Sequence, residues 1–220
     1  MVERQLRRRG IEDERVLAAM AEVPRELFVP EPDRRRAYAD SALPIGYGQT
    51  ISQPWIVAAI CQALELGGDE RVLEIGTGSG YSAAVLARLA AEVVTIERIE
   101  ELAGEARRVL AELAISTVEV VVSDGSRGYP ERAPYEGIAV HATAPGAPAS
   151  LIGQLSVGGR LVVPIAADGA DMLTQFTRVE LDVDVGTGRG LERRALGACR
   201  FVPLIGHEGF EDRGVGRWRL

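Results

Sequence analysis

Residues Val72–Gly80 read VLEIGTGSG, in which a short apolar run and an acidic residue precede three glycines on alternate positions. Tyr81 then opens a segment with helical periodicity. Glycines at Gly76, Gly78 and Gly80 remove the side chains from this strand-to-helix turn, so its backbone can lie against a flat or charged ligand and adopt positive φ. The spacing predicts a binding site for a nucleotide-like cofactor.

Two classes of cofactor bind at a glycine turn of this kind: dinucleotides and S-adenosylmethionine. The dinucleotide fingerprint needs a small sixth residue so that the helix packs closely on the strand, and here Tyr81 stands at that position. The spacing from Glu74 through the three glycines instead resembles the ExGxGxG form of S-adenosylmethionine-dependent methyltransferases, whose loop passes beneath the methionine part of the cofactor. In this interpretation the cofactor contacts of the loop come from Glu74, Gly76, Thr77, Gly78, Ser79 and Tyr81.

Two acidic residues stand at the ends of the next two apolar runs. Glu97 ends EVVTIE. Ligands of open α/β sheets lie beyond the carboxyl ends of the strands, so this carboxylate can accept hydrogen bonds from both ribose hydroxyls. Asp124 and Gly125 end VEVVVSDG. The carboxylate can accept a hydrogen bond from the amino group of adenine, and the glycine lets the backbone approach the adenine ring. Asp-Gly is also a common turn dipeptide, so this pair alone does not decide the question.

The composition is typical of one globular domain. The chain has 220 residues, 46% of them hydrophobic and 26% charged, and its N-terminus has no apolar stretch of the length that a signal peptide or membrane span needs. A net charge of −7 opposes general attraction to nucleic acid. Two cysteines and two histidines offer almost no ligand set for a structural metal. We expect a cytoplasmic, monomeric, metal-free protein that binds neither nucleic acid nor membrane.

Alternation of strand and helix patterns predicts a doubly wound α/β fold. Two strand candidates near the C-terminus, residues 172–183 and 196–203, have no helical pattern between them and should form an antiparallel hairpin appended to the parallel part. The prediction is a mostly parallel, seven-stranded sheet of the Rossmann-like methyltransferase type, with the order of the last two strands left open. The five apolar, β-branched runs of the parallel part start at Val72, Val93, Val118, Ile138 and Leu161.

A different kind of sequence precedes the first strand of this sheet. Two short helical patterns are followed by prolines and then by the polar, glycine-rich stretch 38–54. A helix expected over residues 54–66 leads into the sheet. We therefore expect a single domain, with a small N-terminal helical cap and substrate segment in residues 1–54 and the Rossmann-like core in residues 55–220.

Six segments carry a resemblance that covers almost the whole chain. They are VPRELFVP (23–30), YADSALPIGYGQTISQP (38–54), VLEIGTGSGY (72–81), SDG (123–125), GGRLVVPI (158–165) and RFVPLIG (200–206). Together, and in this order, they resemble the protein-L-isoaspartate (D-aspartate) O-methyltransferases. GQTISQP is the most specific part, because many methyltransferases share the glycine loop.

The resemblance implies a repair enzyme for proteins or peptides that carry L-isoaspartyl residues. It moves a methyl group from S-adenosylmethionine to the free α-carboxylate of the damaged residue, and the ester then closes to a succinimide. A carboxylate has a pKa of about 4 and is already ionised at neutral pH, so no strong general base is needed.

By the same resemblance Ser52 is the catalytic residue, a hydrogen-bond donor that orients the substrate carboxylate. From spacing alone Ser52 fits a helix N-cap better, and the two roles are compatible because a helix N-terminus favours a bound carboxylate. The substrate contacts implied for this segment are Thr50, Ile51, Ser52 and Gln53.

His141 departs from the family pattern, because it stands where the family usually has a small residue such as glycine or threonine. Its side chain could contact substrate or narrow the site, or it could be a passive, hydrogen-bonded residue. Three other functions stay open: a carboxyl methyltransferase for ordinary aspartate of a specific peptide or for a small acid, a nicotinamide-dependent oxidoreductase, and a non-catalytic module. The position of Tyr81 argues against the oxidoreductase.

Overall fold

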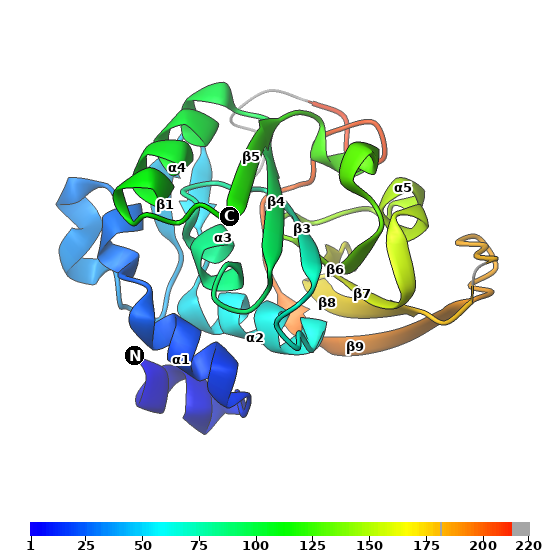
Figure 1. The fold of residues 1–220 in the computed structure, drawn as a ribbon, viewed down its shortest axis with the longest axis horizontal. Helices are drawn as coiled ribbons and strands as arrows, with labels where there is room; N and C mark the ends of the chain where they lie inside the picture. Colours follow the sequence, from blue (N-terminus) through cyan, green and yellow to red (C-terminus); the bar gives the residue numbers. More distant parts are fainter. Residues whose placement is uncertain (181, 213–220) are drawn as a thin grey trace.

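A seven-stranded β-sheet runs through the centre of the molecule (Figure 1). The computed structural model describes residues 1–180 and 182–212. The strand order is β5-β4-β3-β6-β7-β8-β9, in which β3 to β7 are parallel and β8 and β9 are antiparallel to their neighbours. The strands span Arg71–Ile75 (β3), Glu92–Glu97 (β4), Val118–Val122 (β5), Tyr135–Val140 (β6), Leu155–Ile165 (β7), Asp171–Arg178 (β8) and Leu191–Cys199 (β9).

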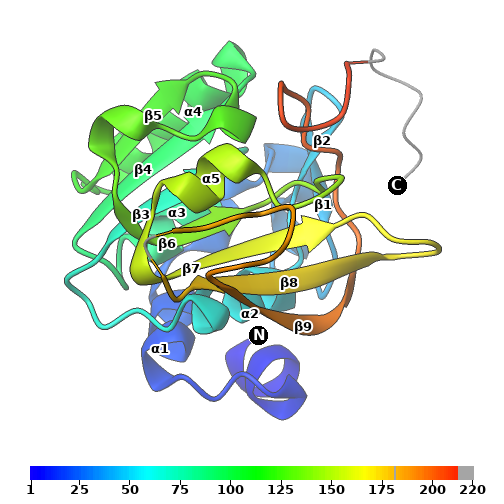
Figure 2. The same cartoon turned by 90° about the vertical axis from the view of Figure 1, so that its right-hand side faces the viewer.

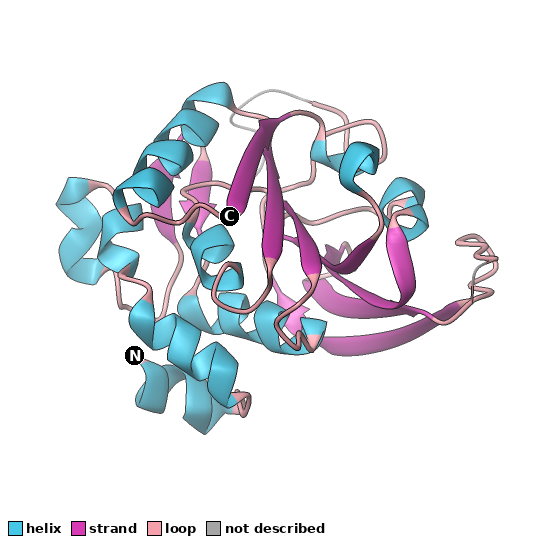
Figure 3. Ribbon diagram, in the orientation of Figure 1, coloured by secondary structure: helices cyan, strands magenta, loops and turns pink. Residues whose placement is uncertain are grey.

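Apolar side chains cover both faces of the inner strands, because successive residues of a strand point to opposite faces. Val72 and Val93 belong to a cluster shared with α1 to α4, whereas their neighbours Leu73 and Val94 belong to a second cluster shared with α5. Helices therefore lie on both sides of the sheet (Figure 3), which confirms the predicted doubly wound fold. They span Glu14–Glu22 (α1), Pro54–Leu64 (α2), Tyr81–Leu86 (α3), Glu100–Glu112 (α4) and Ala149–Gly153 (α5).

The two C-terminal strands form the antiparallel hairpin that the sequence predicts (Figure 2). β8 pairs with β7, and β9 is the edge strand, which settles the order left open above. The second strand begins at Leu191, earlier than expected, and the charged residues 192–194 near its start are exposed at this edge of the sheet. Charge on an edge strand is compatible with pairing on its other side.

A small hairpin of β1 (Leu43–Gly46) and β2 (Gln49–Ile51) lies within the stretch predicted only as polar and rich in glycine. Its two-residue turn is Tyr47-Gly48, with φ of 53° and 71°. Two consecutive positive φ values suit the twist of a two-residue hairpin, and this turn was the only signal for the hairpin in the sequence.

Short helical turns make up much of the remaining N-terminal part. The first of the two short helical patterns expected before the prolines, near residues 3–9, is a π-type turn followed by a 3₁₀ turn. The second, expected over residues 13–22, is matched by α1. No helix in the described part of the chain is both long and apolar enough to cross a bilayer. The short turns of the N-terminal part span Val2–Leu6, Arg7–Arg9, Arg25–Phe28 and Glu31–Arg36. Two more, Gly125–Arg127 and Pro130–Arg132, lie between β5 and β6.

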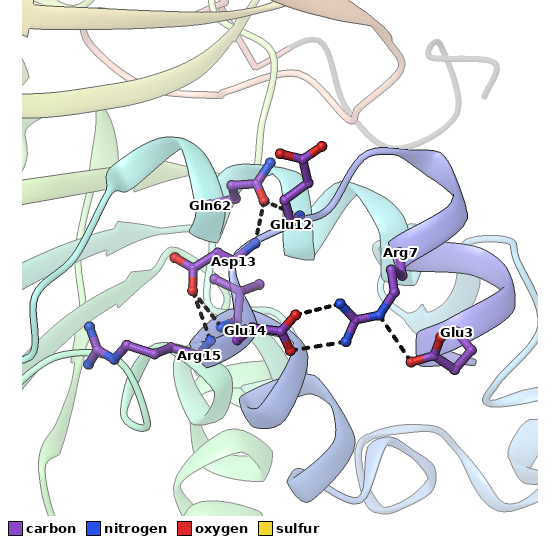
Figure 4. A network of polar contacts seen from close by, with 8 residues as sticks. Glu3, Arg7, Glu12, Asp13, Glu14, Arg15 and Gln62 are labelled. Atoms are coloured by element: carbon purple, nitrogen blue, oxygen red, sulfur yellow. Dashed lines mark hydrogen bonds and ion pairs between the residues drawn. The ribbon is translucent and has the colours of Figure 1, made fainter.

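Polar contacts join the N-terminal part to α2 (Figure 4). Gln62 Oε1 accepts hydrogen bonds from the backbone N–H groups of Glu12 at 2.7 Å and Asp13 at 3.0 Å. The Asp13 carboxylate in turn caps α1 by accepting the N–H of Arg15 at 2.8 Å. Beneath these contacts, Leu6 and other N-terminal side chains share the apolar cluster of α2. The N-terminal part is thus packed directly onto the sheet-bearing part.

Candidate active site

A cleft of about 390 Å³ opens at the carboxyl ends of β3, β4 and β6. The strand order reverses between β3 and β6, and loops that leave a parallel sheet in opposite directions at such a point leave a crevice between them. Its walls come from the loops after these strands, the β1–β2 hairpin and the C-terminal segment. Its size suits a small-molecule ligand.

The glycine loop forms the floor of the cleft. Gly76, Gly78 and Gly80 have φ of 91°, 53° and 89°, a region that residues with a side chain rarely adopt. The loop is tied to the sheet because Gly76 donates its N–H to the carbonyl oxygen of Ile96 at 2.8 Å. A Cβ at Gly78 would also come within 3.2 Å of Ile45 Cδ1. The bare main chain is thus a requirement of this turn.

Glu97 lies in the cleft with its carboxylate only partly used. Its Oε2 accepts the N–H of Gly78 at 2.9 Å, and its Oε1 accepts the N–H of Ile99 at 3.0 Å. A carboxylate offers about four lone-pair sites, so each oxygen can accept one more hydrogen bond. The residue is only 6% exposed and lines the cleft, so the predicted ribose contact has both a position and free acceptors.

Asp124 and Gly125, predicted as a pair, are placed differently. Gly125 lines the cleft, and a Cβ there would come within 2.5 Å of Ile75 Cγ2, so only glycine fits. Asp124 is not part of the lining. Its carboxylate accepts the backbone N–H of His207 at 2.9 Å and the hydroxyl of Ser126 at 2.7 Å.

The hydrogen bonds of Asp124 also set its ionisation. Burial alone would raise the pKa of Asp124, but the bonds from His207 and Ser126 hold it below its usual value. The ionised carboxylate therefore ties the C-terminal segment to the loop after β5. Its adenine contact stays a prediction, and these bonds leave it fewer free acceptor sites.

Glu74 lies beneath the cleft and does not line it. Its buried Oε2 accepts the hydroxyl of Thr95 at 2.5 Å. Because the Thr95 proton points to Glu74, the hydroxyl of Thr77, 2.7 Å from Thr95 Oγ1, is the donor of that second bond. Glu74 thus supports the glycine loop from below through two threonines. Four of its loop neighbours line the cleft: Gly76, Thr77, Gly78 and Ser79.

Tyr81 borders the cleft with a buried ring. The ring packs edge-on against Phe28, with centroids 5.6 Å apart, and the guanidinium of Arg25 lies 4.7 Å from its centroid. Its hydroxyl points to the sulfur of Met20 at 3.7 Å. The large side chain that argued against a dinucleotide site therefore turns towards the N-terminal part.

The substrate segment reaches the cleft with three of its four predicted residues. Thr50, Ile51 and Ser52 line it, whereas Gln53 points to the surface and donates to the carboxylate of Asp40 at 2.7 Å. Gln53 is also the N-cap of α2 and makes no side-chain capping bond. The hydroxyl of Ser52 is therefore not used as a helix cap.

His141, directly after β6, stands in the wall beside the glycine loop. Its Nε2 lies 2.8 Å from the hydroxyl of Ser82 and 3.4 Å from Glu74 Oε1. A Cβ at Gly76 would come within 3.5 Å of the His141 Cβ, so the two loops touch. His141 is hydrogen-bonded on the buried side and borders the cleft on the other. Its hydrogen bond to Ser82 fits the predicted passive role, and its place in the lining is compatible with the predicted substrate contact.

Two parts of the site were not predicted as site residues from the sequence. Residues 202–205 form a wall of the cleft, held where the N–H of Leu204 donates to the carbonyl oxygen of Thr143 at 2.7 Å. Arg25 is buried behind the substrate segment and donates to the carbonyl oxygen of Ser52 at 2.7 Å. Neither part has a periodic pattern, and the only signal was that both fall in segments of the family resemblance.

The sheet order, the glycine floor and the carboxylate at the end of β4 are those of a Rossmann-like methyltransferase that uses S-adenosylmethionine. A solved structure named protein-L-isoaspartate O-methyltransferase has a TM-score of 0.81 and 30% identity to this chain, covering 94% of it and 67% of that chain. A Plasmodium falciparum structure in complex with S-adenosyl-L-homocysteine has a TM-score of 0.76, covers 90% of this chain and 94% of that one, and at 24% identity supports the fold alone.

Sequence comparisons identify the family. The family described as Protein-L-isoaspartate(D-aspartate) O-methyltransferase (PCMT) matches residues 1–209. The protein-L-isoaspartate O-methyltransferase 1 of Rhodopseudomonas palustris (strain HaA2) is 55% identical over 96% of this chain and 83% of its own length. The protein-L-isoaspartate O-methyltransferase of Methanoculleus marisnigri is 52% identical over 96% of this chain and 92% of its own length. The chain belongs to the protein-L-isoaspartate O-methyltransferase family, which confirms the predicted resemblance.

The residues of the cleft fit S-adenosylmethionine. A side chain at Gly78 would be strained and crowded, which leaves bare main chain as the surface that the loop presents to the cleft. Glu97 keeps acceptor sites for hydroxyl groups in a position screened from water. Glu97 and the glycine loop hold each other in place through the hydrogen bond from the Gly78 N–H to the Glu97 carboxylate.

Gly78→Val is expected to abolish cofactor binding. A β-branched side chain at φ of 53° strains the loop and occupies the ligand's side of the turn. Isothermal titration with S-adenosylhomocysteine should show no measurable binding. Gly104→Val is the control, because a Cβ added to this helical glycine would have no neighbouring atom within 4 Å. Unchanged binding by folded Gly78→Val protein would contradict the assignment of the loop.

Glu97→Ala is expected to weaken S-adenosylhomocysteine binding by about 10- to 100-fold, the usual value of a hydrogen bond to a charged group. Glu97→Gln keeps one hydrogen-bond acceptor, so its affinity for S-adenosylhomocysteine should lie between those of the wild-type protein and Glu97→Ala. Glu105→Ala, on the exposed side of α4, serves as the charge control. The same titration provides the measurement, and an affinity equal to that of the wild-type protein would remove the ribose role.

Proposed function

We propose that this chain transfers a methyl group from S-adenosylmethionine to the free α-carboxylate of L-isoaspartyl residues in damaged proteins, with Ser52 orienting that carboxylate. The observation that carries the proposal is that Thr50, Ile51 and Ser52 line the same cleft as the glycine loop and Glu97. The proposed sites of the methyl acceptor and the methyl donor thus open into the same cleft. Membership of the family supports the substrate class.

Methyl transfer to a carboxylate requires that the enzyme position the carboxylate against the methyl group, and it does not require a strong base. The substrate carboxylate has a pKa of about 4 and arrives ionised, so no residue has to remove a proton. When bound, S-adenosylmethionine supplies an electrophilic methyl group whose leaving group is a neutral thioether. Holding the reacting atoms about 3 Å apart and aligned can contribute several kcal/mol to lowering the barrier.

Ser52 is suited to this positioning. Its hydroxyl is not needed as a helix cap, because Gln53 is the N-cap of α2. Ser52 directly precedes this N-cap and so lies beside the N-terminus of an eleven-residue helix, whose dipole favours a carboxylate. In the proposed role the hydroxyl donates a hydrogen bond to one carboxylate oxygen, and the other oxygen stays free to react.

Repair follows from the product. Methylation turns a poor leaving group into a good one, so the neighbouring backbone nitrogen can displace methanol and close a succinimide. Hydrolysis of this ring returns part of the chains to a normal aspartyl linkage. The enzyme therefore has only to make the ester and release it.

His141 is proposed as a substrate contact from the wall of the cleft. Ser82 holds one ring nitrogen, which sets the orientation of the ring. Tilted packing against Phe201, with ring centroids 6.4 Å apart, supports it from the other side. A ring held in this way is a fixed surface that narrows the cleft compared with glycine or threonine.

We also propose that the chain is one domain, with a helical cap and substrate segment in residues 1–54 and a Rossmann-like core in residues 55–220. A single domain is supported by the apolar cluster that the N-terminal part shares with the sheet. A monomeric state, a cytoplasmic location and the absence of a metal ion stay predictions from the sequence.

The central test is a comparison of isoaspartyl and aspartyl peptides of one sequence with labelled S-adenosylmethionine. We expect label only in the isoaspartyl peptide. Ser52→Ala should lower kcat/KM by about 10- to 100-fold, as expected for a hydrogen bond to a charged group, while the Kd for S-adenosylhomocysteine is retained. Ser156→Ala, whose hydroxyl bonds Glu136 outside the cleft, is the control. Equal labelling of both peptides would favour the alternative, a carboxyl methyltransferase that acts on ordinary aspartate of a specific peptide or on a small acid.

His141→Gly is expected to keep methyl transfer while raising the KM for the peptide, because the variant widens the cleft. It also removes the partner of Ser82, so the melting temperature should fall. Steady-state kinetics and thermal unfolding measure the two effects. A loss of kcat by more than about 100-fold, with the protein folded, would show that the imidazole takes part in the chemistry.

A further inference from the structure

Arg25 is a buried cation directly behind the substrate segment. Its side chain has 0% exposure, and it stands at the start of the short 3₁₀ turn Arg25–Phe28. Among the residues that the structure describes, no carboxylate forms an ion pair with it. Burial lowers the pKa of Arg25, but an arginine keeps its charge at neutral pH in such a setting.

The guanidinium holds three separate parts of the chain together. Its Nη2 donates to the carbonyl oxygen of Ser52 at 2.7 Å, and its Nε donates to the carbonyl oxygen of Ala37 at 2.7 Å. Its plane also lies over the ring of Tyr81, 4.7 Å from the centroid. Tyr81 is the first residue of α3 and directly follows the glycine loop. One side chain therefore connects the substrate segment with the helix that begins at the cofactor floor.

Stability alone does not explain why an arginine is buried at this position. A buried guanidinium loses its hydration, and carbonyl oxygens with an aromatic face compensate only part of that loss. The third nitrogen, Nη1, has no hydrogen-bond partner among the described residues. An apolar side chain of similar volume would avoid both costs. What it could not do is hold the Ser52 carbonyl in one direction.

We propose that Arg25 is a positioning residue for methyl transfer, which holds the Ser52 main chain at a set place relative to α3 and the glycine loop. The inference rests on the proposed role of the Ser52 hydroxyl. Arg25 does not line the cleft, so it acts through Ser52 and does not touch the substrate. Its planar fork supplies two directed N–H groups and a flat face at once, a combination that lysine lacks.

The test is a double-mutant cycle of Arg25→Lys and Ser52→Ala, measured with an isoaspartyl peptide. In the wild-type background Arg25→Lys should lower kcat/KM by about tenfold or more, because a misplaced hydroxyl loses its hydrogen bond. In the Ser52→Ala background the same change should cost less than about threefold, because the hydroxyl to be positioned is already gone. The Kd for S-adenosylhomocysteine should change less than about threefold in both.

Arg15→Lys is the matched control. Arg15 also donates to two backbone carbonyls, those of Leu66 at 2.5 Å and Leu89 at 3.1 Å, but it lies outside the cleft. It should lose some stability and keep kcat/KM. If Arg25→Lys does not fold, Arg25→Met provides the second variant, because it removes the buried charge and the tie together. Arg25→Met should show the same non-additive loss with Ser52→Ala.

The outcomes separate the two proposals. If Ser52→Ala lowers activity but Arg25→Lys and Arg25→Met do not, or if their effects multiply independently, the positioning role is wrong and the Ser52 role stands. If Ser52→Ala leaves activity unchanged, the proposed function of Ser52 is wrong, and the role of Arg25 falls with it. A loss of S-adenosylhomocysteine binding equal to the loss of kcat/KM would place the effect of Arg25 on the cofactor side and overturn the inference.

Discussion

The left-handed main chain of the glycine loop is the constraint on which the rest of the site depends. Gly76 and Gly78 can take φ of 91° and 53° at little cost only because they lack a side chain. The turn brings the N–H of Gly78 to the carboxylate of Glu97, while Gly76 stays bonded to the carbonyl oxygen of Ile96. Both bonds go to β4, so the floor of the cleft is fixed by the strand beside β3, and its position follows from the register of this strand pair.

Buried polar groups around this floor connect it to the other walls. Thr95 links Glu74 below the sheet edge to Thr77 in the loop, and Glu74 in turn lies beside His141. On the opposite side Arg25 joins the substrate segment to α3. Such networks are expensive to bury unless their geometry is well satisfied, and when satisfied they favour one arrangement. In the proposed function these buried polar groups align the walls of the cleft, which suits a reaction whose nucleophile is already ionised.

Local patterns in the sequence were sufficient for most of the fold. Strands buried on both faces leave continuous apolar runs, so β3, β4, β6 and β7 were visible without knowledge of their neighbours. The edge strand β5 is only partly buried, and its β-branched residues made it visible. The hairpin β1–β2 was missed because it is short and lies in a polar stretch, where the only signal is its two-residue turn. The edge strand β9 was placed too late because its charged residues hide the strand pattern.

The sequence by itself determined the class of fold, the glycine loop and the carboxylate at Glu97, because each depends on residues close together in the chain. Tertiary structure decided which predicted side chains face the cleft. Gln53 turns to Asp40, and Asp124 turns to His207, because partners distant in sequence offer them hydrogen bonds. The burial of Arg25 has the same origin: its partners lie 12 and 27 residues away, and no local pattern records a contact made only when the chain has folded.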